Sequence, residues 1–411
     1  SDVNIRGNDY LRGHVSGGWQ ILSKEAFSIS QIEEMAGFID SATAAIDLKK
    51  GRDIDRSYTP FGESVVDPKT QNGSQRSFIS SRTLYRFRVN ITPIRSPIDD
   101  ATTAELTVRT LPAMPPTPEE YGIEPEFYEN FVPYKGGISI LTGGTGHGKS
   151  SLLYSIFRGL VNEGKTAPYG LKIIDLCSPI EYVINDCDSK TFISQTEVGR
   201  MLRDLENNTE SGNWSYAGRG SMRRKPDIIN IQEIRDKPTA NVALMSANTG
   251  HLATATLHNN SCASSVQRFL RFFSHEERIG VGTDFFDYLH CLCNQELVVG
   301  KDGKTRFALR EYFFITPAFR EKVISQTNVE LWPAMIHHEL TEQGKRPRSR
   351  RTIICQTKYE HALRRYRAGE VGENIVIAMK KRYESVPKNL MEIGPQAAVV
   401  TQREIDEANQ D

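Results

Sequence analysis

The chain has 411 residues, a length that suggests two or three domains, each large enough to bury its own core. Lysine plus arginine equals aspartate plus glutamate at 51 each, so the net charge gives no whole-molecule reason to bind nucleic acid or an anionic membrane. No uninterrupted apolar run reaches the roughly 18 residues of a membrane-spanning helix, and six cysteines in so long a chain fit a reducing compartment. These properties favour a cytoplasmic, multi-domain protein with no direct membrane span.

Residues 1–110 are predicted to form a mixed α/β domain. Their start, Ser1-Asp-Val-Asn-Ile5, has neither the basic region nor the apolar region of a secretory signal. It also lacks an initiator methionine, which suggests a processed start. Thr83–Ile91 alternates with period two, as half-buried strands do. Ser30–Phe38 has the apolar spacing of an amphipathic helix, with Ser28 or Ser30 as its cap.

Residues 111–118, Leu-Pro-Ala-Met-Pro-Pro-Thr-Pro, predict an interdomain linker. Four prolines in this stretch cannot continue a helix or a central strand and favour extended polyproline geometry. The linker is therefore stiff, and the first domain is expected to swing as a unit.

Residues 119–385 are predicted to form a second α/β domain, and 386–411 a loose tail of low apolar content. Four apolar runs typical of buried strands occupy residues 137–142, 171–175, 227–232 and 253–257. Such strands, separated by helices, predict a mostly parallel sheet with helices on both faces. Beyond about residue 318 the pattern is helical, and Tyr359–Tyr383 is the clearest amphipathic stretch.

A phosphate-binding loop follows the first of these strands. Gly143-Gly-Thr-Gly-His-Gly-Lys-Ser150 fits the Walker A pattern at every fixed position and lies between a strand and a helix. Glycines let backbone N–H groups turn toward phosphate oxygens, and the helix N-terminus adds partial positive charge. Lys149 is expected to bind the β- and γ-phosphates of ATP, and the Ser150 hydroxyl to bind Mg²⁺. The predicted nucleotide-binding residues are Gly143, Gly144, Thr145, Gly146, His147, Gly148, Lys149, Ser150 and Ser151.

Two carboxylates are candidates for the hydrolytic step. Hydrolysis needs a group that orients water as well as a phosphate cradle. Glu233 follows the apolar strand at 227–232, as a Walker B acidic residue does, and is the candidate for orienting the attacking water. Glu181, shortly after the strand at 171–175, is a second carboxylate for water or metal, and a solvated loop position is the alternative for it.

Several motifs in this order resemble the PilT-like secretion and traffic ATPases, and most closely the DotB/TraJ type of type IVB secretion and conjugation systems. The resemblance covers residues 1 to about 385. Its motifs are Ser1–Ile5, Arg86-Phe-Arg-Val-Asn90, Val108–Pro112, Walker A, the "Asp box" Cys177-Ser-Pro-Ile-Glu181, the Walker B stretch Arg223–Asp236 and the "His box" Thr249–His258.

The resemblance implies a PAS-like N-terminal domain, a RecA-like ATPase domain and a homohexameric ring at the cytoplasmic face of an inner-membrane apparatus. It implies roles for Lys149 and Ser150 on phosphate and Mg²⁺, and for Glu233 on the hydrolytic water. It assigns sensing of the γ-phosphate to His258, and less strongly to His251. It also directs Arg86, Arg88 and Arg109 of the first domain to the nucleotide, because guanidinium groups match phosphate oxygens. An exposed strand face is the alternative for Arg86 and Arg88.

Three departures from the family pattern keep a second function open. Cys177 and Ser178 replace acidic residues of the Asp box, and Gln232 stands where glycine precedes the Walker B glutamate. Asn248 occupies a position that is often glutamate before the His box. A thiol cannot replace a carboxylate as a base near neutral pH. The alternative is therefore a nucleotide-gated assembly scaffold with little hydrolysis.

Two other functions use the same fold. A nucleic-acid motor would use the basic run Lys345–Arg351, although such runs are usually solvated loops. A type IV pilus retraction motor is a variant of the secretion hypothesis. Gly51–Asp55 and Ser178 match the DotB/TraJ type better.

Overall fold

The computed structural model describes residues 2–15, 18–58, 86–96, 102–111, 114–133 and 136–384. The chain divides into two compact units. The first comprises Ser1–Pro115 with Cys177–Asn185, and the second Pro116–Leu176 with Asp186–Asp411. The predicted tail at 386–411 and part of the predicted linker lie outside the described residues.

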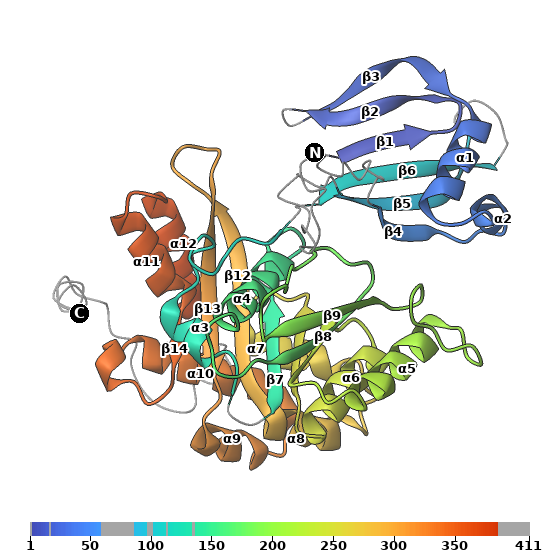
Figure 1. The fold of residues 1–411 in the computed structure, drawn as a ribbon. Helices are drawn as coiled ribbons and strands as arrows, with labels where there is room; N and C mark the ends of the chain where they lie inside the picture. Colours follow the sequence, from blue (N-terminus) through green and yellow to red (C-terminus); the bar gives the residue numbers. More distant parts are fainter. Residues whose placement is uncertain are drawn as a thin grey trace, which may run out of the picture. The chain divides into compact units, whose positions relative to one another are not determined.

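The N-terminal unit contains an antiparallel sheet of six strands in the order β3-β2-β1-β6-β5-β4 (Figure 1). Its strands are β1 (Asp2–Arg6), β2 (Asp9–Val15), β3 (Gly18–Phe27), β4 (Ile54–Tyr58), β5 (Arg86–Arg95) and β6 (Thr102–Leu111). Two helices follow β3 in the chain, α1 (Ile29–Ile39) and α2 (Ala44–Lys49).

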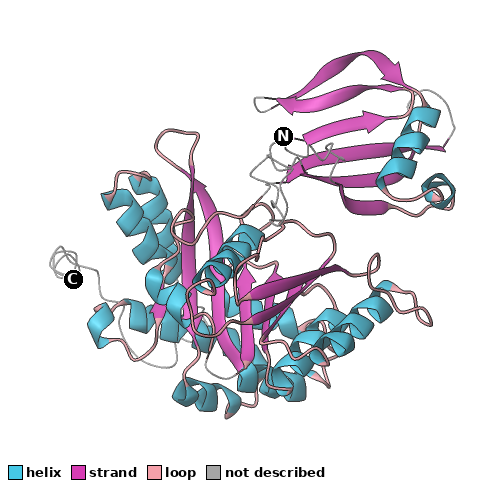
Figure 2. Ribbon diagram, in the orientation of Figure 1, coloured by secondary structure: helices cyan, strands magenta, loops and turns pink. Residues whose placement is uncertain are grey.

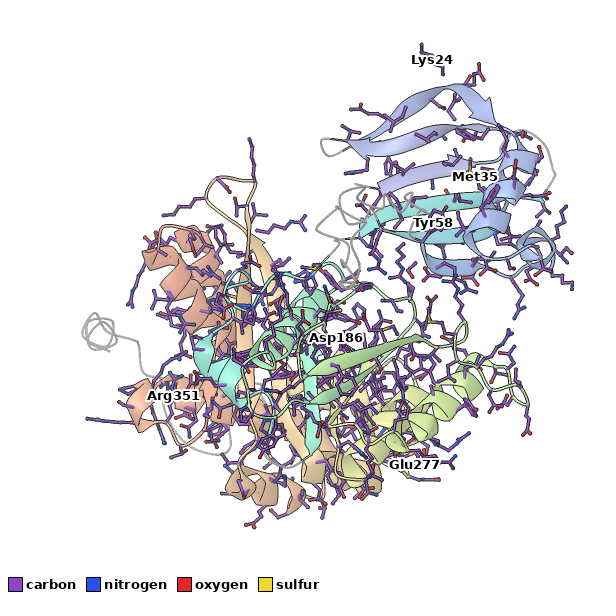
Figure 3. All side chains as sticks on the ribbon, viewed as in Figure 1. Lys24, Met35, Tyr58, Asp186, Glu277 and Arg351 are labelled. Atoms are coloured by element: carbon purple, nitrogen blue, oxygen red, sulfur yellow. The ribbon has the colours of Figure 1, made fainter. Side chains whose placement is uncertain are left out.

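Helix α1 begins at a capping box in which Ser28 and Gln31 satisfy each other's backbone N–H groups. Its buried face, with Ile32 and Ala36, packs on apolar side chains of the sheet. Met35 and Tyr58, labelled in Figure 3, pack against the same core. The helix predicted at 30–38 and the strand predicted at 83–91 are confirmed as α1 and β5, and residues 83–85 lie outside the described ranges.

The second unit contains an eight-stranded sheet in the order β14-β13-β12-β7-β11-β10-β8-β9. Figure 2 distinguishes its strands, in magenta, from the helices, in cyan. Strands β12, β7, β11, β10 and β8 are mutually parallel, and β13 and β14 continue the sheet antiparallel beyond β12. The strands are β7 (Gly137–Thr142), β8 (Lys172–Cys177), β9 (Phe192–Glu197), β10 (Ile228–Glu233), β11 (Leu252–Leu257), β12 (Leu289–Val299), β13 (Arg306–Phe314) and β14 (Cys355–Gln356).

Helices cover both faces of this sheet. One face packs a large apolar core against α5, α6, α7, α8 and α10, and α4 lies on the other face. The helices are α3 (Pro125–Asn130), α4 (Lys149–Glu163), α5 (Glu210–Met222), α6 (Lys237–Asn248), α7 (Cys262–Leu270), α8 (Arg278–Tyr288), α9 (Pro317–Ile324), α10 (Trp332–Gly344), α11 (Lys358–Arg367) and α12 (Glu373–Glu384), with short 3-10 turns at Val329–Leu331 and Arg348–Arg350.

A buried polar row crosses the sheet beneath α4. Asp175 on β8, Asn230 on β10 and Thr254 on β11 are register partners, and all three are fully buried. The Asn230 amide donates to Asp175 at 2.7 Å, and the Thr254 hydroxyl donates to Asn230 at 3.0 Å. From α4, the Tyr154 hydroxyl donates to Asp175 Oδ2 at 2.8 Å. These bonds satisfy polar groups that would otherwise destabilise the interior, and they tie α4 to the strands.

The predicted fold class is confirmed: an antiparallel α/β domain precedes a domain built on a mostly parallel sheet. The four predicted strands correspond to β7, β8, β10 and β11. The β12–β13 hairpin is not identified by the pattern analysis, because both strands are buried on both faces and show no period-two alternation. Tyr359–Tyr383 forms two helices rather than one, since Gly369, with φ of 76°, ends α11.

We predict that Tyr154→Phe destabilises the second unit by about 1–3 kcal/mol, because Asp175 loses a buried donor. Chemical or thermal unfolding followed by circular dichroism measures the change. Tyr169→Phe is the matched control, since that side chain is 86% exposed. Equal stability of the two variants would contradict the assigned contribution of this hydrogen bond.

Candidate nucleotide site

Strand register brings three motifs to one edge of the parallel sheet. Thr142, the last residue of β7, pairs with Leu257, the last residue of β11. Thr256 of β11 pairs with Glu233, the last residue of β10. Because parallel strands end at the same edge, the phosphate loop, His258 and Glu233 are adjacent although they are far apart in sequence.

Close neighbours leave no room for a side chain at two glycines of the loop from Gly143 to Gly148. Gly148 has φ of 74°, and a Cβ there would lie 2.5 Å from the Tyr121 hydroxyl. At Gly143 a Cβ would lie 2.4 Å from the backbone oxygen of Gln295 on β12. The loop is therefore packed closely from below, and its outer part, at Thr145 and Gly146, is exposed.

The residues of this loop fit a bound phosphate and its cation. No side chain caps α4, whose N-cap is Gly148, so the first N–H groups of the helix are available to an anion. The buried Lys149 side chain donates from Nζ to the carbonyl oxygens of Gly143 and Gly144, at 3.0 Å each. Ser150, the second residue of α4, is half-buried, and its hydroxyl is the oxygen ligand expected for Mg²⁺.

His258 lies between Lys149 and Glu233. Its Nδ1 is 3.4 Å from Lys149 Nζ, and its Nε2 is 3.0 Å from Glu233 Oε1. Burial and the positive charge of Lys149 lower the pKa of His258, while Glu233 acts in the opposite direction. The neutral imidazole then accepts at Nδ1 from Lys149 and donates from Nε2 to Glu233.

A β-bulge places Glu233. The register between β10 and β11 shifts by one residue between Ile231 and Glu233, and Gln232 is the extra residue. The Thr256 hydroxyl donates to the Gln232 carbonyl at 2.6 Å and fixes the bulge. Gln232 has no positive φ, so a side chain is accommodated where the family pattern has glycine.

Two residues that sequence reasoning missed hold the phosphate loop from β12 and from the segment before α3. The Gln295 amide donates to the His147 carbonyl at 2.8 Å, and the Tyr121 hydroxyl donates to the Gly148 carbonyl at 3.0 Å. The Leu297 N–H donates to His147 Nδ1 at 3.2 Å. Neither Gln295 nor Tyr121 belongs to a recognisable motif. The register of β12 beside β7 reveals Gln295, and the hydrogen bonds of Tyr121 with Gly148 and Gln295 reveal Tyr121.

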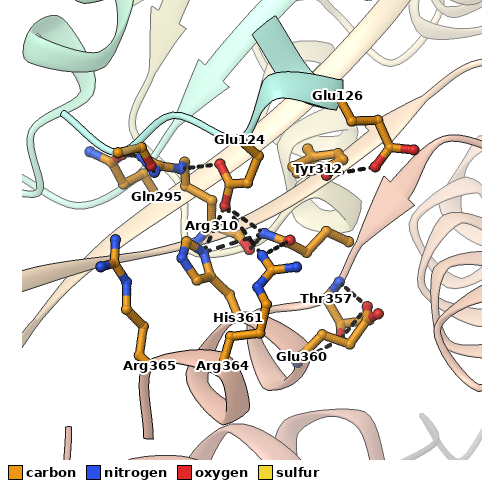
Figure 4. Close-up of polar contacts among 12 residues, drawn as sticks. Glu124, Glu126, Gln295, Arg310, Tyr312, Thr357, Glu360, His361, Arg364 and Arg365 are labelled. Atoms are coloured by element: carbon orange, nitrogen blue, oxygen red, sulfur yellow. Dashed lines mark hydrogen bonds and ion pairs between the residues drawn. The ribbon is translucent and has the colours of Figure 1, made fainter. Parts of the chain in front are cut away.

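Behind Gln295 lies a buried ion cluster around Arg310 and Glu124 (Figure 4). The fully buried Arg310 donates to Glu124 at 2.8 Å and to the Gln295 side-chain oxygen at 3.3 Å. Burial would raise the pKa of Glu124, but Arg310 and His361 hold it well below its usual range. The cluster therefore connects the phosphate loop to α11, which carries His361.

A second group inside the N-terminal unit contains three of the remaining predicted residues, Arg86, Arg88 and Glu181. Arg86 donates to the carbonyl oxygens of Ile180 and Glu181, at 2.9 and 2.8 Å. Arg88 pairs with Asp55 at 2.6 Å and lies 3.5 Å from Glu181. Arg109, 60% exposed, pairs with Asp2. The structure thus joins Arg86, Arg88 and Glu181 to one another, and their roles toward nucleotide stay predictions.

His251 lies apart from His258, and its role toward the γ-phosphate stays a prediction. It precedes β11 at the amino end of the strand, where its carbonyl accepts from Gly137 N–H at the start of β7. A strand of six residues spans about 20 Å, so His251 lies at the opposite edge of the sheet from His258. Its Nδ1 contacts Thr249 and Ser246 instead.

The six cysteines are all free thiols, and five of them are buried. Burial raises the pKa of Cys262, Cys291 and Cys293, so these side chains stay protonated. Cys177 ends β8 with a fully buried side chain. Among the residues that the structure describes, no group of histidine, cysteine and acidic side chains has the arrangement of a metal site.

A profile of the family described as "Type II/IV secretion system protein" matches residues 65–407. The chain belongs to this family. The resemblance to PilT-like traffic ATPases predicted from the motifs is thereby confirmed. None of the described helices combines the length and apolar character that a membrane crossing needs.

Two curated relatives of this secretion-system family come from Pseudomonas aeruginosa. The type IV pilus ATPase PilU is 31% identical over 266 residues, which cover 65% of this chain and 63% of PilU. The type IV pilus retraction ATPase PilT is 31% identical over 250 residues, which cover 61% of this chain and 66% of PilT. The chain thus matches less than two thirds of the length of either relative.

Solved structures share both domains of the fold. The ATPase DotB of Legionella pneumophila has a TM-score of 0.73 and 26% identity, over 93% of this chain and 92% of that one. The pilus retraction motor PilT with bound ADP has a TM-score of 0.65 and covers 95% of each chain, and its 20% identity supports the fold alone.

We predict that His258 titrates below the ordinary histidine value of about 6.5 and is neutral at neutral pH. Lys149→Met should raise its pKa, because a nearby positive charge is lost, and Glu233→Gln should lower it further. NMR titration of histidine-labelled protein measures these shifts, with His258→Ala to assign the signal. A pKa that does not respond to Lys149→Met would contradict the contact.

Proposed function

We propose that this chain hydrolyses Mg-ATP, and that it does so as a homohexamer that powers a type IVB secretion or conjugative transfer apparatus. The observation that carries the proposal is the continuous contact from Lys149 through His258 to Glu233 at the edge of the parallel sheet. A phosphate-binding lysine and a carboxylate for water are joined there by one imidazole. Such an arrangement serves both binding and hydrolysis of a nucleoside triphosphate.

The phosphate loop would hold the β- and γ-phosphates. No side chain caps the first N–H groups of α4, so they are available to an anion, and the Lys149 ammonium group is already held by the carbonyl groups of Gly143 and Gly144. Ser150 would hold Mg²⁺, which when bound neutralises charge on the phosphate oxygens. Gln295 and Tyr121 fix the conformation of the loop by donating hydrogen bonds to the carbonyl groups of His147 and Gly148.

Glu233 would orient the attacking water and accept its proton. Oε1 of Glu233 faces His258 Nε2, so the imidazole fixes the carboxylate and leaves Oε2 to accept from water. Movement of Lys149 toward a γ-phosphate would change its contact with His258 Nδ1. Because the imidazole of His258 contacts both side chains, a change at Lys149 on phosphate binding would alter the hydrogen bond from His258 to Glu233.

The choice of apparatus rests on the DotB structure and on the motifs that resemble the DotB/TraJ type. We infer partners among the cytoplasmic components of a membrane-bound secretion or conjugation complex, and attachment to the inner membrane through them. The PilU and PilT relatives support pilus retraction as the variant function. Direct nucleic-acid binding has less support, because Lys345, Arg348 and Arg351 of the basic run pair with Glu342, Glu126 and Glu360.

The alternative function, a nucleotide-gated scaffold, is favoured by the Asp box. Cys177 is fully buried, and Glu181 contacts Arg88 and Arg86 within the N-terminal unit. A wild-type protein that binds ATP, releases almost no phosphate and gains turnover through Cys177→Glu would establish this alternative in place of the motor.

We predict that Glu233→Gln lowers steady-state phosphate release by roughly a hundredfold or more, because the base for water is lost. Binding of a fluorescent ATP analogue should be unchanged, whereas Lys149→Ala should abolish it. Glu206→Gln, an exposed glutamate of the same unit, is the control and should match the wild type. Turnover that persists in Glu233→Gln would remove Glu233 from the catalytic step.

We also predict that the protein forms a species of six chains with Mg-ATP, and that Glu233→Gln forms it as readily. Sedimentation velocity over a range of protein concentrations measures the assembly. A monomer at every concentration, with or without nucleotide, would contradict the ring.

A further inference from the structure

Lys358, the first residue of α11, carries a buried ammonium group outside the motifs of the nucleotide site. Its side chain is 2% exposed. Nζ donates to the backbone oxygen of Asn260 at 3.1 Å and lies 3.2 Å from Glu296 Oε2. A buried ammonium destabilises the fold unless it is paired and hydrogen-bonded, so these two contacts account for its presence.

The acceptor of that hydrogen bond lies two residues after His258. Residues 258–261 form a short loop between β11 and α7. The side chain of His258 meets Lys149 and Glu233, and the carbonyl of Asn259 accepts from the Asn294 amide at 3.0 Å. The carbonyl of Asn260 accepts from Lys358. These two carbonyl groups of the loop are thus held by β12 and by α11.

Lys358 is itself fixed by an ion cluster. Glu296 of β12 accepts from Arg382 of α12 at 2.6 Å as well as from Lys358. Burial would raise the pKa of Glu296, but Arg382 and Lys358 lower it to about 2, so the carboxylate is charged. The Lys358 N–H donates to the Tyr383 hydroxyl at 3.0 Å. These contacts tie the first turn of α11 to β12 and α12.

We infer that Lys358 is a positioning residue for His258: its hydrogen bond to the Asn260 carbonyl holds the loop that sets the imidazole between Lys149 and Glu233. The inference rests on the proposed function, because it concerns the efficiency of that hydrolytic site. Lys358 touches neither phosphate nor Glu233 and acts through the backbone. A displacement of the loop by about 1 Å is enough to reduce the rate of a positioned reaction strongly.

The chain offers a matched control for this residue. Arg382 is a second cation on the same Glu296, and within the described residues its recorded side-chain contacts are to that carboxylate. Arg382→Met removes an ion pair of Glu296 and leaves the hydrogen bond to Asn260 in place. Lys358→Met removes both. A difference in kcat between the two variants therefore measures the contribution of the hydrogen bond from Lys358 to the loop.

The test measures phosphate release and binding of a fluorescent ATP analogue for the full chain and both variants. Lys358→Met should lower kcat by roughly tenfold to a hundredfold, and Arg382→Met should stay near the wild type. The Kd for the analogue should stay within about twofold in both, since the phosphate loop is untouched. Equal kcat in the two variants, or a loss of affinity that accounts for the change, would overturn the inference.

Coupling to His258 separates positioning from a general loss of stability. In a His258→Ala background, Lys358→Met should lower kcat by less than about twofold further, because both changes act on one interaction. Effects that multiply would show that Lys358 does not act through His258. If Lys358→Met does not yield folded protein, Lys358→Gln, whose side chain is too short for the same reach, is compared with Arg382→Met and the same difference is expected.

Hydrogen exchange of peptides that cover residues 257–262 reads the attachment without turnover. Exchange there should be faster in Lys358→Met than in Arg382→Met or the wild type, with no nucleotide present. A wild type that releases no phosphate would overturn the proposed function and leave this readout to decide the attachment. Equal protection in both variants would overturn the attachment itself.

Discussion

The parallel direction of β7, β11 and β10 is the constraint on which the site depends. The carboxyl ends of parallel strands lie at one edge of the sheet, so the residues that follow these strands are close in space although they are far apart in the sequence. Register then fixes which residues meet: Thr142 beside Leu257 brings the phosphate loop to His258, and the bulge at Gln232 brings Glu233 to the same imidazole. The buried row of Asp175, Asn230 and Thr254 holds this register from within the sheet.

Sequence reasoning succeeded where local chemistry decides structure. The glycines before Lys149, the apolar runs of β7 and β10 and the cap at Ser28 each carry a local signal. It failed where structure depends on pairing over long distances. The β12–β13 hairpin has no alternation, and the roles of Gln295 and Lys358 follow only from the neighbours of β12. His251 shares a motif with His258, yet the length of β11 separates them.

Buried charges in the second unit occur in matched sets. Arg310 forms an ion pair with Glu124, and Lys358 forms one with Glu296. Each carboxylate has a second partner, because Glu124 also contacts His361 and Glu296 also contacts Arg382. Both sets include a residue of β12 or β13 and reach the first turn of α11, through His361 and Lys358. The C-terminal helices are therefore joined to the nucleotide site by polar contacts, which specify direction and distance more narrowly than apolar packing.

Gln295 and Glu296 are consecutive residues whose side chains serve different parts of the site. Gln295 supports the phosphate loop, and Glu296 anchors Lys358 and Arg382. Since side chains alternate along a strand, insertion or deletion of one codon upstream in β12 would move each of these two side chains to the opposite face of the sheet. The glutamate would then face the carbonyl groups of the loop, and the lysine would lose its counter-charge. Length variation in evolving relatives is therefore expected in the turn at residues 300–305 and not within the strand before it.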